Sequence, residues 1–340
     1  MIKNIKPLGF TWETRDPFLF CVHHRDAYPQ GDGKMGPAVS LAGRNIGQDF
    51  DQKDGWNMYH GHQVPGFPAH PHRGFETVTV VLDGLVDHHD SAGSSGRYGN
   101  GDVQWMTAGS GLQHSEMFPL IHKDQANPLE LFQIWLNLPS SSKMASPAYK
   151  MLWSESIPIL RSQDEQGRKI ETRIIAGTFG GKSAPEPAPD SWAAQSTNQV
   201  AICVITLDAE AEFVLPSCKA GVNRDLYFYE GSSVTIANQE ISEYHAIELV
   251  SSEEIKLKNG PKQSRILLLQ GMPIGEPVVQ YGPFVMNTQA EIQQAFDDFR
   301  ATQFGGWPWD RNDPVNPEDQ DRYARHSDGT EEVIDVRDEN

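Results

Sequence analysis

Cysteine is scarce in this sequence, and the few that occur exclude two classes of protein. The three cysteines are Cys21, Cys203 and Cys218, an odd and scattered set that contains no Cys-x-x-Cys pair. A disulfide-stapled scaffold needs an even, closely spaced set, and a thiolate zinc site needs paired cysteines. We expect neither, and the pattern is typical of a protein from a reducing compartment.

Long apolar runs are absent as well. No stretch approaches the roughly 18 to 20 apolar residues of a membrane span, and residues 1–20 contain no apolar run that reads as a signal peptide. We therefore expect a soluble, cytoplasmic protein with no membrane partner.

Positively charged residues are fewer than negatively charged ones. Lys and Arg number 28 against 46 Asp and Glu, which gives a formal net charge of −18. A negative surface repels phosphate, so direct binding of nucleic acid is disfavoured, whereas binding to a protein partner is not.

Short β-branched segments are what the sequence has in quantity. Hydrophobic residues make up 38% of the 340 residues, a length that is comfortable for two domains. Strand-like segments with Gly, Asp or Pro at their ends occupy much of residues 75–139 and recur from 199 to 271. Regularly spaced strands with Gly-rich turns predict β-sandwiches or β-barrels, and therefore an all-β fold.

One segment near the C-terminus has helical periodicity instead. Thr288 followed by Glu291 forms a plausible capping box. The apolar positions after it recur at helical spacing and would share one side of a helix: Ile292, Ala295, Phe296 and Phe299.

These patterns divide the chain into four expected parts. They are a first domain over 1–140, connector and loops over 141–195, a second domain with the helix over 196–302, and an extended polar tail over 303–340. We expect the aromatic part of the tail to lie against the body and its final acidic residues to be mobile. Residues 226–236 resemble 79–89 when Gly231 is laid on Gly84, which indicates a duplicated β-module.

Two alternating pairs suggest a metal site in the first copy: His70 with His72, and His114 with Glu116. Residues two apart in a strand point to the same side, and a barrel can bring two such strands face to face. Three imidazoles and a carboxylate suit a divalent transition metal, either zinc in a closed tetrahedron or Fe, Mn, Ni or Cu with positions left open.

The fourth ligand is open at this point, because Glu76 has the same strand parity as His72. Glu76 could replace Glu116, support a ligand, or be a plain acid. The remaining nearby histidines are predicted to be solvated: His60, His62, His88 and His89. In the repeat register, His70 and His72 align with Ser217 and Lys219, so we expect the second module to bind no ion.

Three segments resemble the pirin family of bicupin proteins: HPHRGFETVTVVLDG, GDVQWMTAGSGLQHSEM and EPVVQYGPFVMNT. The resemblance runs over most of residues 10–300. It implies two stacked cupin β-barrels, with one metal ion, commonly iron as Fe(II), in the N-terminal barrel. The family's ligand pattern falls on His70, His72, His114 and Glu116, whereas the general cupin pattern places its glutamate at Glu76.

The resemblance implies two classes of function. Some pirin-like proteins are dioxygenases that cleave flavonols such as quercetin, and Glu116 would then be the catalytic base. Others resemble redox-sensing regulators that bind a transcription factor or a metabolic enzyme. A deep apolar cavity at the metal favours the first class, and a closed or shallow site favours the second. We expect a monomer. Candidate neighbours of the site are Phe75, Trp105, Met106, Met117, Phe118 and Gln133.

Overall fold

The computed structural model describes residues 1–334, which form two compact units built mainly of β-strands. The first-barrel unit comprises His23–Ile134, Ser140–Ser154 and the chain from Glu276 onward. The second-barrel unit comprises Met1–Val22, Trp135–Pro139 and Glu155–Gly275. The expected all-β bicupin architecture with one C-terminal helix is confirmed.

Two six-stranded sheets build the first barrel. One has the order β11-β8-β5-β10-β3-β2, and its strands are Ala148–Leu152, Val103–Thr107, Phe75–Asp83, Asn127–Asn137, Phe18–Tyr28 and Thr11–Trp12. The other has the order β27-β26-β7-β6-β9-β4, and its strands are Glu331–Val333, Tyr323–Arg325, Ser95–Gly99, Leu85–Asp90, Leu112–Met117 and Gly66–His72. An aromatic and aliphatic core that includes Tyr59, Val81, Val86 and Tyr98 is completely buried.

The second barrel combines a seven-stranded and a four-stranded sheet around an aliphatic core that includes Ile205, Leu226 and Ile247. The larger sheet has the order β1-β21-β18-β23-β16-β13-β12: Ile2–Pro7, His245–Leu249, Asn223–Glu230, Ser264–Gly271, Ala201–Leu207, Lys169–Ala176 and Ile159–Gln163. The smaller has the order β17-β22-β19-β20: Glu212–Leu215, Ile255–Asn259, Ser233–Ile236 and Gln239–Ser242.

The short elements lie outside these sheets. Two hairpins pair β14 with β15 and β24 with β25: Thr178–Phe179, Lys182–Ser183, Val279–Tyr281 and Phe284–Met286. The 3-10 turns η1 to η4 are Lys53–Gly55, Trp192–Ala194, Ser196–Asn198 and Gln303–Gly305. All three cysteines are free. Among residues 1–334, no helix combines the length and the apolarity needed to cross a membrane.

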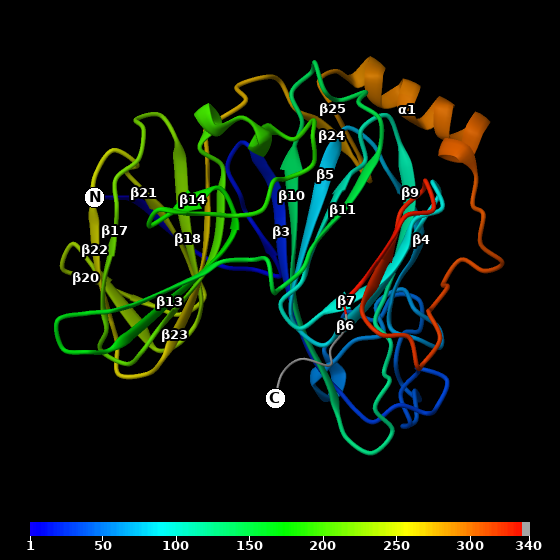
Figure 1. The fold of residues 1–340 in the computed structure, drawn as a ribbon, viewed down its shortest axis with the longest axis horizontal. Coiled ribbons are helices and arrows are strands. Elements are labelled where there is room, and N and C mark those ends of the chain that lie inside the picture. Colours follow the sequence, from blue (N-terminus) through cyan, green and yellow to red (C-terminus); the bar gives the residue numbers. More distant parts are fainter. Residues whose placement is uncertain (335–340) are drawn as a thin grey trace. The chain divides into compact units, whose positions relative to one another are not determined.

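Helix α1 (Gln289–Thr302) forms with the capping box that the sequence indicates. The Glu291 amide donates to Thr288 Oγ1 at 3.3 Å, and the Thr288 amide donates to Glu291 Oε2 at 2.7 Å. The helix lies beside the β24–β25 hairpin (Figure 1). Phe296 of the helix packs against Phe284 of the hairpin at a ring separation of 4.8 Å. Arg73 Nη1 donates to Asp298 Oδ2 at 2.7 Å, which ties the helix to the residue after β4.

Three sequence ranges are organised differently from our expectation. Residues 141–195, expected as connector and loops, supply β11 to the first barrel and β12 and β13 to the second. The compact units also place α1 with the first barrel and β1 with the second. A division of the chain into consecutive domains could not predict this arrangement, because sheet edges are completed by strands from distant parts of the sequence.

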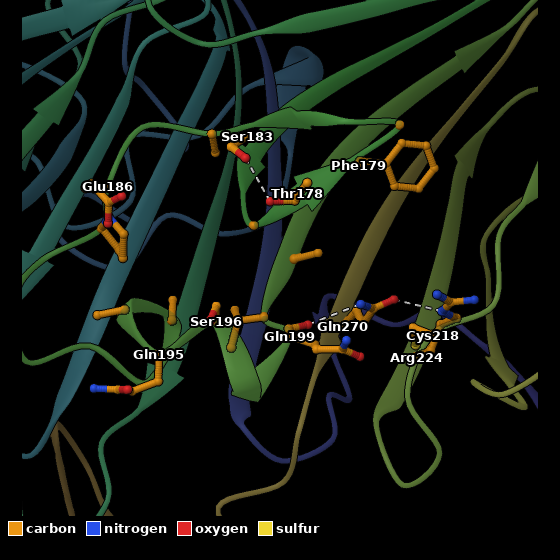
Figure 2. A pocket seen from close by; sticks show the side chains of 18 of the residues that line it. Thr178, Phe179, Ser183, Glu186, Gln195, Ser196, Gln199, Cys218, Arg224 and Gln270 are labelled. Carbon is orange, nitrogen blue, oxygen red and sulfur yellow. Dashed lines mark hydrogen bonds between the residues drawn. The ribbon is translucent and has the colours of Figure 1, made fainter.

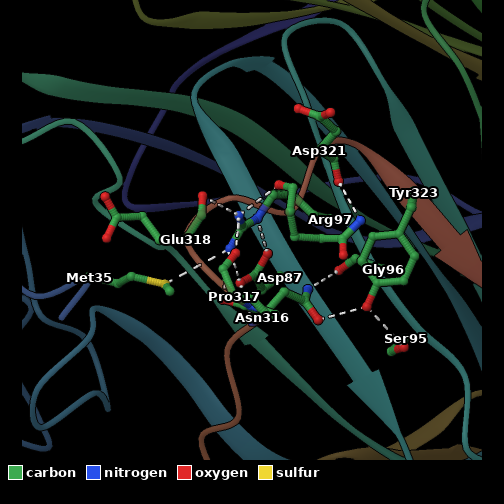
Figure 3. A network of polar contacts seen from close by, with 12 residues as sticks. Met35, Asp87, Ser95, Gly96, Arg97, Asn316, Pro317, Glu318, Asp321 and Tyr323 are labelled. Carbon is green, nitrogen blue, oxygen red and sulfur yellow. Dashed lines mark hydrogen bonds and ion pairs between the residues drawn. The ribbon is translucent and has the colours of Figure 1, made fainter. Parts of the chain in front are cut away.

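The C-terminal segment is not simply an extended tail, because β26 pairs with β7 of the first barrel. The buried Arg97 anchors it (Figure 3): its guanidinium donates to both oxygens of Asp87, at 2.7 and 2.8 Å, and to the Asn316 and Pro317 carbonyls. The aromatic part lies against the body as expected, since Trp309 Nε1 donates to the Asp90 carbonyl at 2.8 Å. The final residues, 335–340, lie outside the described range.

Candidate metal centre

Strands β4 and β9 carry the two alternating pairs side by side. They pair antiparallel, with His70 opposite His114, and an irregularity in the register lies between Phe67 and His70. Because side chains two apart share a face, His72 joins His70, and Glu116 joins His114. A local pairing of two strands therefore brings together residues more than forty positions apart.

The three imidazoles converge on one point. Their ligand atoms all lie within 4.8 Å of one another. The ring of His114 is 4.5 Å from that of His70 and 4.9 Å from that of His72, centroid to centroid. His72 and His114 are buried, whereas His70 is half-buried. This is a donor set that can hold a divalent transition metal through imidazole nitrogens.

Burial keeps the three rings neutral, which is the form that binds metal. Loss of hydration lowers the pKa of His70 to about 4 and the pKa values of His72 and His114 well below the ordinary value. His70 Nδ1 lies 2.9 Å from the Pro68 carbonyl, an acceptor, so Nδ1 carries the proton and Nε2 presents its lone pair.

His114 gives the strongest local indication of an ion. It is fully buried, and within residues 1–334 neither of its ring nitrogens has a hydrogen-bond partner. A buried imidazole normally hydrogen-bonds through at least one nitrogen. An ion at the centre of the triad would supply the missing interaction, so the residues present fit a metal.

Glu116 stands at the edge of the triad, with Oε2 3.8 Å from His114 Nε2. Thr79 Oγ1 donates to its Oε1 at 3.0 Å and Gln133 Nε2 donates to its Oε2 at 2.5 Å. Burial raises the pKa of the carboxyl group, and the two hydrogen bonds oppose that shift. The carboxylate is thus oriented beside the imidazoles. Thr79 was not recognised from the sequence, and Gln133 was only a candidate neighbour.

Glu76 occupies a different environment. Its Oε1 accepts hydrogen bonds from Trp105 Nε1 at 3.1 Å and from Thr107 Oγ1 at 2.7 Å. In strand β5, Glu76 is three residues from Thr79, so the two side chains point to opposite faces. Because Thr79 contacts Glu116, the face that carries Glu76 and Trp105 is turned away from the triad.

The prediction that all four neighbouring histidines are solvated is wrong for two of them. His60 and His62 are exposed. His88 is fully buried, with its ring 5.5 Å from that of His114 and stacked on Tyr149 at 4.9 Å. His89 is also buried, and its ring contacts Trp309. Strand β6 pairs with β9 so that His88 lies opposite Glu116.

The C-terminal segment also contacts strands β4 and β9. Gln113, next to His114, donates through Nε2 to the Gln303 carbonyl at 2.6 Å. The amide of Ala69, next to His70, donates to the Asn312 carbonyl at 2.7 Å. The segment therefore contacts, on each strand, the residue next to a histidine of the triad.

Comparison with known proteins identifies related sequences over most of the chain. The model of the family described as Pirin matches residues 11–136, and that of the Pirin C-terminal cupin domain matches residues 202–305. A Pseudomonas aeruginosa protein named "Putative quercetin 2,3-dioxygenase" is 38% identical over 71% of this chain and 80% of its own length. Pirin-1 of Arabidopsis thaliana is 38% identical over 71% and 78%.

A solved structure has the same fold. The crystal structure of quercetin 2,3-dioxygenase from Acinetobacter baumannii superposes with a TM-score of 0.70 at 26% identity, and the match covers 90% of this chain and 98% of that one.

Proposed function

Because the chain belongs to the pirin family, we propose that it is a metal-dependent dioxygenase acting on a flavonol-like phenol of the quercetin type. The observation that carries the proposal is the group of three neutral imidazoles with an oriented carboxylate at its edge. The names of the Pseudomonas and Acinetobacter relatives support the substrate class.

We assign Fe(II) to this site, and Ni, Mn, Cu or Zn would suit the same donors. His70, His72 and His114 would hold the ion, with Glu116 as the fourth ligand. A redox-active divalent ion supplies Lewis acidity and a route for electrons between the substrate and dioxygen.

The protein's own part in the reaction centres on Glu116. The carboxylate accepts the proton of the substrate's 3-hydroxyl group, and burial raises its pKa, which makes it a stronger base. Thr79 and Gln133 hold its two oxygens in place. The overall reaction consumes one dioxygen, opens the central ring and releases one carbon monoxide, and both oxygen atoms of dioxygen remain in the depside product.

Two buried polar side chains, on strands β6 and β5, support binding of a hydroxylated ligand beside the triad. His88 Nδ1 and Thr77 Oγ1 have no hydrogen-bond partner among the described residues. Thr77 shares a face of β5 with Thr79, which contacts Glu116. Such groups lose free energy unless a water or a ligand satisfies them.

A second candidate is an iron-dependent redox-sensing regulator that binds a transcription factor or a metabolic enzyme. The enclosure of the triad favours it, because His72 is 3% exposed and His114 is 0% exposed. In that case a change in the oxidation state of the metal would be read by a protein partner. The monomeric state and the cytoplasmic location stay predictions under both functions.

Anaerobic reconstitution with metal distinguishes the dioxygenase from the redox-sensing regulator. The protein is loaded in turn with Fe(II), Mn, Ni, Cu and Zn, mixed with quercetin, and exposed to dioxygen while flavonol absorbance and carbon monoxide are followed. The proposal expects loss of flavonol with stoichiometric carbon monoxide for at least one redox-active metal. No turnover with any metal would remove flavonol dioxygenation and leave the regulator.

A further inference from the structure

The second-barrel unit contains a cavity of about 490 Å³ that the proposed reaction does not use (Figure 2). It is lined by the loop after β13, the turns η2 and η3, the loop after β17, and residues at the ends of β16 and β23. Its volume falls within the roughly 300 to 1,000 Å³ typical of small-molecule sites.

The position of the cavity can be compared with the first copy of the duplicated module. In the repeat register, Ser217 and Lys219 align with His70 and His72, and Ser217 lines the cavity. Neither aligned residue carries an imidazole, and Lys219 is not part of the cavity lining. A different ligand chemistry is expected there.

Arg224 supplies that chemistry. Its side chain lines the cavity from β18, and the residue is 2% exposed. Its Nε donates to Gln270 Oε1 at 2.8 Å and its Nη1 donates to the Pro216 carbonyl at 2.7 Å, and the Cys218 thiol is its third polar neighbour. In the part of the chain that the structure describes, no carboxylate pairs with Arg224.

The other buried arginines among the described residues have a carboxylate partner. In the first-barrel unit Arg97 pairs with Asp87 and Arg73 pairs with Asp298, and the half-buried Arg15 pairs with Asp225 in the same unit as Arg224. A buried guanidinium stays charged and is costly without an anion. Arg224 therefore has two neutral acceptors where these arginines have an anion. The cavity beside Arg224 has room for an anion.

The rest of the lining favours an organic anion. Apolar wall is contributed by Phe179, Pro185, Pro187, Ala193 and Val200. Figure 2 shows Glu186 on the opposite side of the cavity from Arg224, and Glu186 is exposed, so solvent screens its charge. A single guanidinium matches one carboxylate in a bidentate manner, whereas a phosphate dianion would need further positive groups.

We propose that this cavity is a binding site for a small organic carboxylate, whose carboxylate pairs with Arg224 and whose apolar body lies on the proline and alanine wall. The site is independent of the metal centre and of the proposed dioxygenase reaction. Gln270 positions the guanidinium, and it is itself held because its Nε2 donates to the Gln199 carbonyl at 3.1 Å.

Benzoate is the probe, and Cys218 provides a local readout. Cys218 lines the cavity and is half-buried, while Cys21 and Cys203 are buried. Alkylation of Cys218 by neutral iodoacetamide is followed by peptide mass spectrometry, with calorimetric titration in parallel. Benzamide tests the need for the charge, and inorganic phosphate tests the need for an organic body. The His114→Ala variant, with its metal ligand removed, tests whether benzoate binds at the metal instead.

Gln270→Glu is the decisive variant, because it places a carboxylate on Arg224 without changing the shape of the side chain. Arg161→Gln is the matched control, since it removes a positive charge from the same barrel at an exposed site. Arg224→Gln is a further variant. Its binding data are interpreted only if its circular dichroism spectrum matches that of the native protein.

We expect benzoate to bind with a stoichiometry of one and to slow Cys218 alkylation in the native protein, in His114→Ala and in Arg161→Gln. Gln270→Glu should weaken both effects by roughly tenfold or more. Equal protection by benzamide, tighter binding of phosphate, loss of binding in His114→Ala, unchanged binding in Gln270→Glu, or no binding of benzoate would each overturn the proposal.

Discussion

Glu116 Oε2 lies 3.8 Å from His114 Nε2, and both side chains come from the same face of strand β9. The distance is close enough for the two atoms to bind one ion after a small movement, and the hydrogen bonds from Thr79 and Gln133 hold the carboxylate there. Glu76, by contrast, is already engaged by Trp105 and Thr107 on the other face of β5.

Replacing each glutamate by glutamine distinguishes the two. We expect Glu116→Gln to lower metal affinity by roughly 10- to 100-fold, because a charged donor is lost at the ion. Glu76→Gln should leave metal affinity nearly unchanged, since its carboxylate faces away from the imidazoles. Competition with a chromophoric chelator measures both. A larger loss in Glu76→Gln would mean that the general cupin position supplies the ligand.

His114→Ala should remove the metal. It deletes the central imidazole, which has no other hydrogen-bond partner among the described residues, and we expect metal affinity to fall by at least about 100-fold. His62→Ala is the control, because His62 is exposed and outside the triad. Elemental analysis after dialysis measures retention. Native-like metal content in His114→Ala would place the ion elsewhere.

Arg97→Met tests how the C-terminal segment is anchored. It leaves Asp87 buried with no guanidinium partner, so we expect a loss of about 3 to 5 kcal/mol in the free energy of unfolding, measured by urea titration. The double variant with Asp87→Leu should recover most of this loss. Arg325→Met, at an exposed ion pair, should cost less than about 1 kcal/mol. Equal losses in the two single variants would contradict the assigned role of Arg97.

Asp26 should give the first barrel a distinct pH dependence. Burial raises the pKa of this carboxyl to about 7, against the opposing hydrogen bonds from Tyr59 and Asn57. The unfolded chain, with an ordinary carboxyl pKa near 4, releases the proton first as pH rises. The free energy of unfolding therefore falls between about pH 4 and pH 7, by up to about 4 kcal/mol from this group.

Asp26→Asn removes that contribution. Urea titrations of the native protein and the variant at several pH values should show a difference in stability that declines as pH rises from about 4 to 7. Asp51→Asn, at an exposed aspartate of the same unit, should show no such trend. A difference that is constant with pH would mean that Asp26 ionises normally in the folded protein.

The triad could be predicted because it depends on local rules. Strand alternation places His70 with His72 and His114 with Glu116. The antiparallel pairing of β4 with β9 then brings the two pairs together. The choice between Glu76 and Glu116 could not be made by parity. Strand β4 ends at His72, and Gly74, with a φ of 86°, turns the chain before β5, so counting residues from one strand into the next does not preserve the face.

The burial of His88 and His89 could not be read from local sequence. The rings that cover them belong to Tyr149 and Trp309, about 60 and 220 residues further along the chain. The pairing of β26 with β7 has the same origin, since it joins segments more than two hundred residues apart. Alternation and turn residues predict which strands exist, whereas edge pairing depends on the assembled barrel.

Anomalous diffraction from crystals of the iron-reconstituted protein, recorded at the iron absorption edge, tests the central claim most directly. The account predicts one strong peak in the first barrel, roughly 2.0 to 2.2 Å from a ring nitrogen of each of His70, His72 and His114. An iron peak away from this triad, or iron-reconstituted protein that shows no peak there, would contradict it.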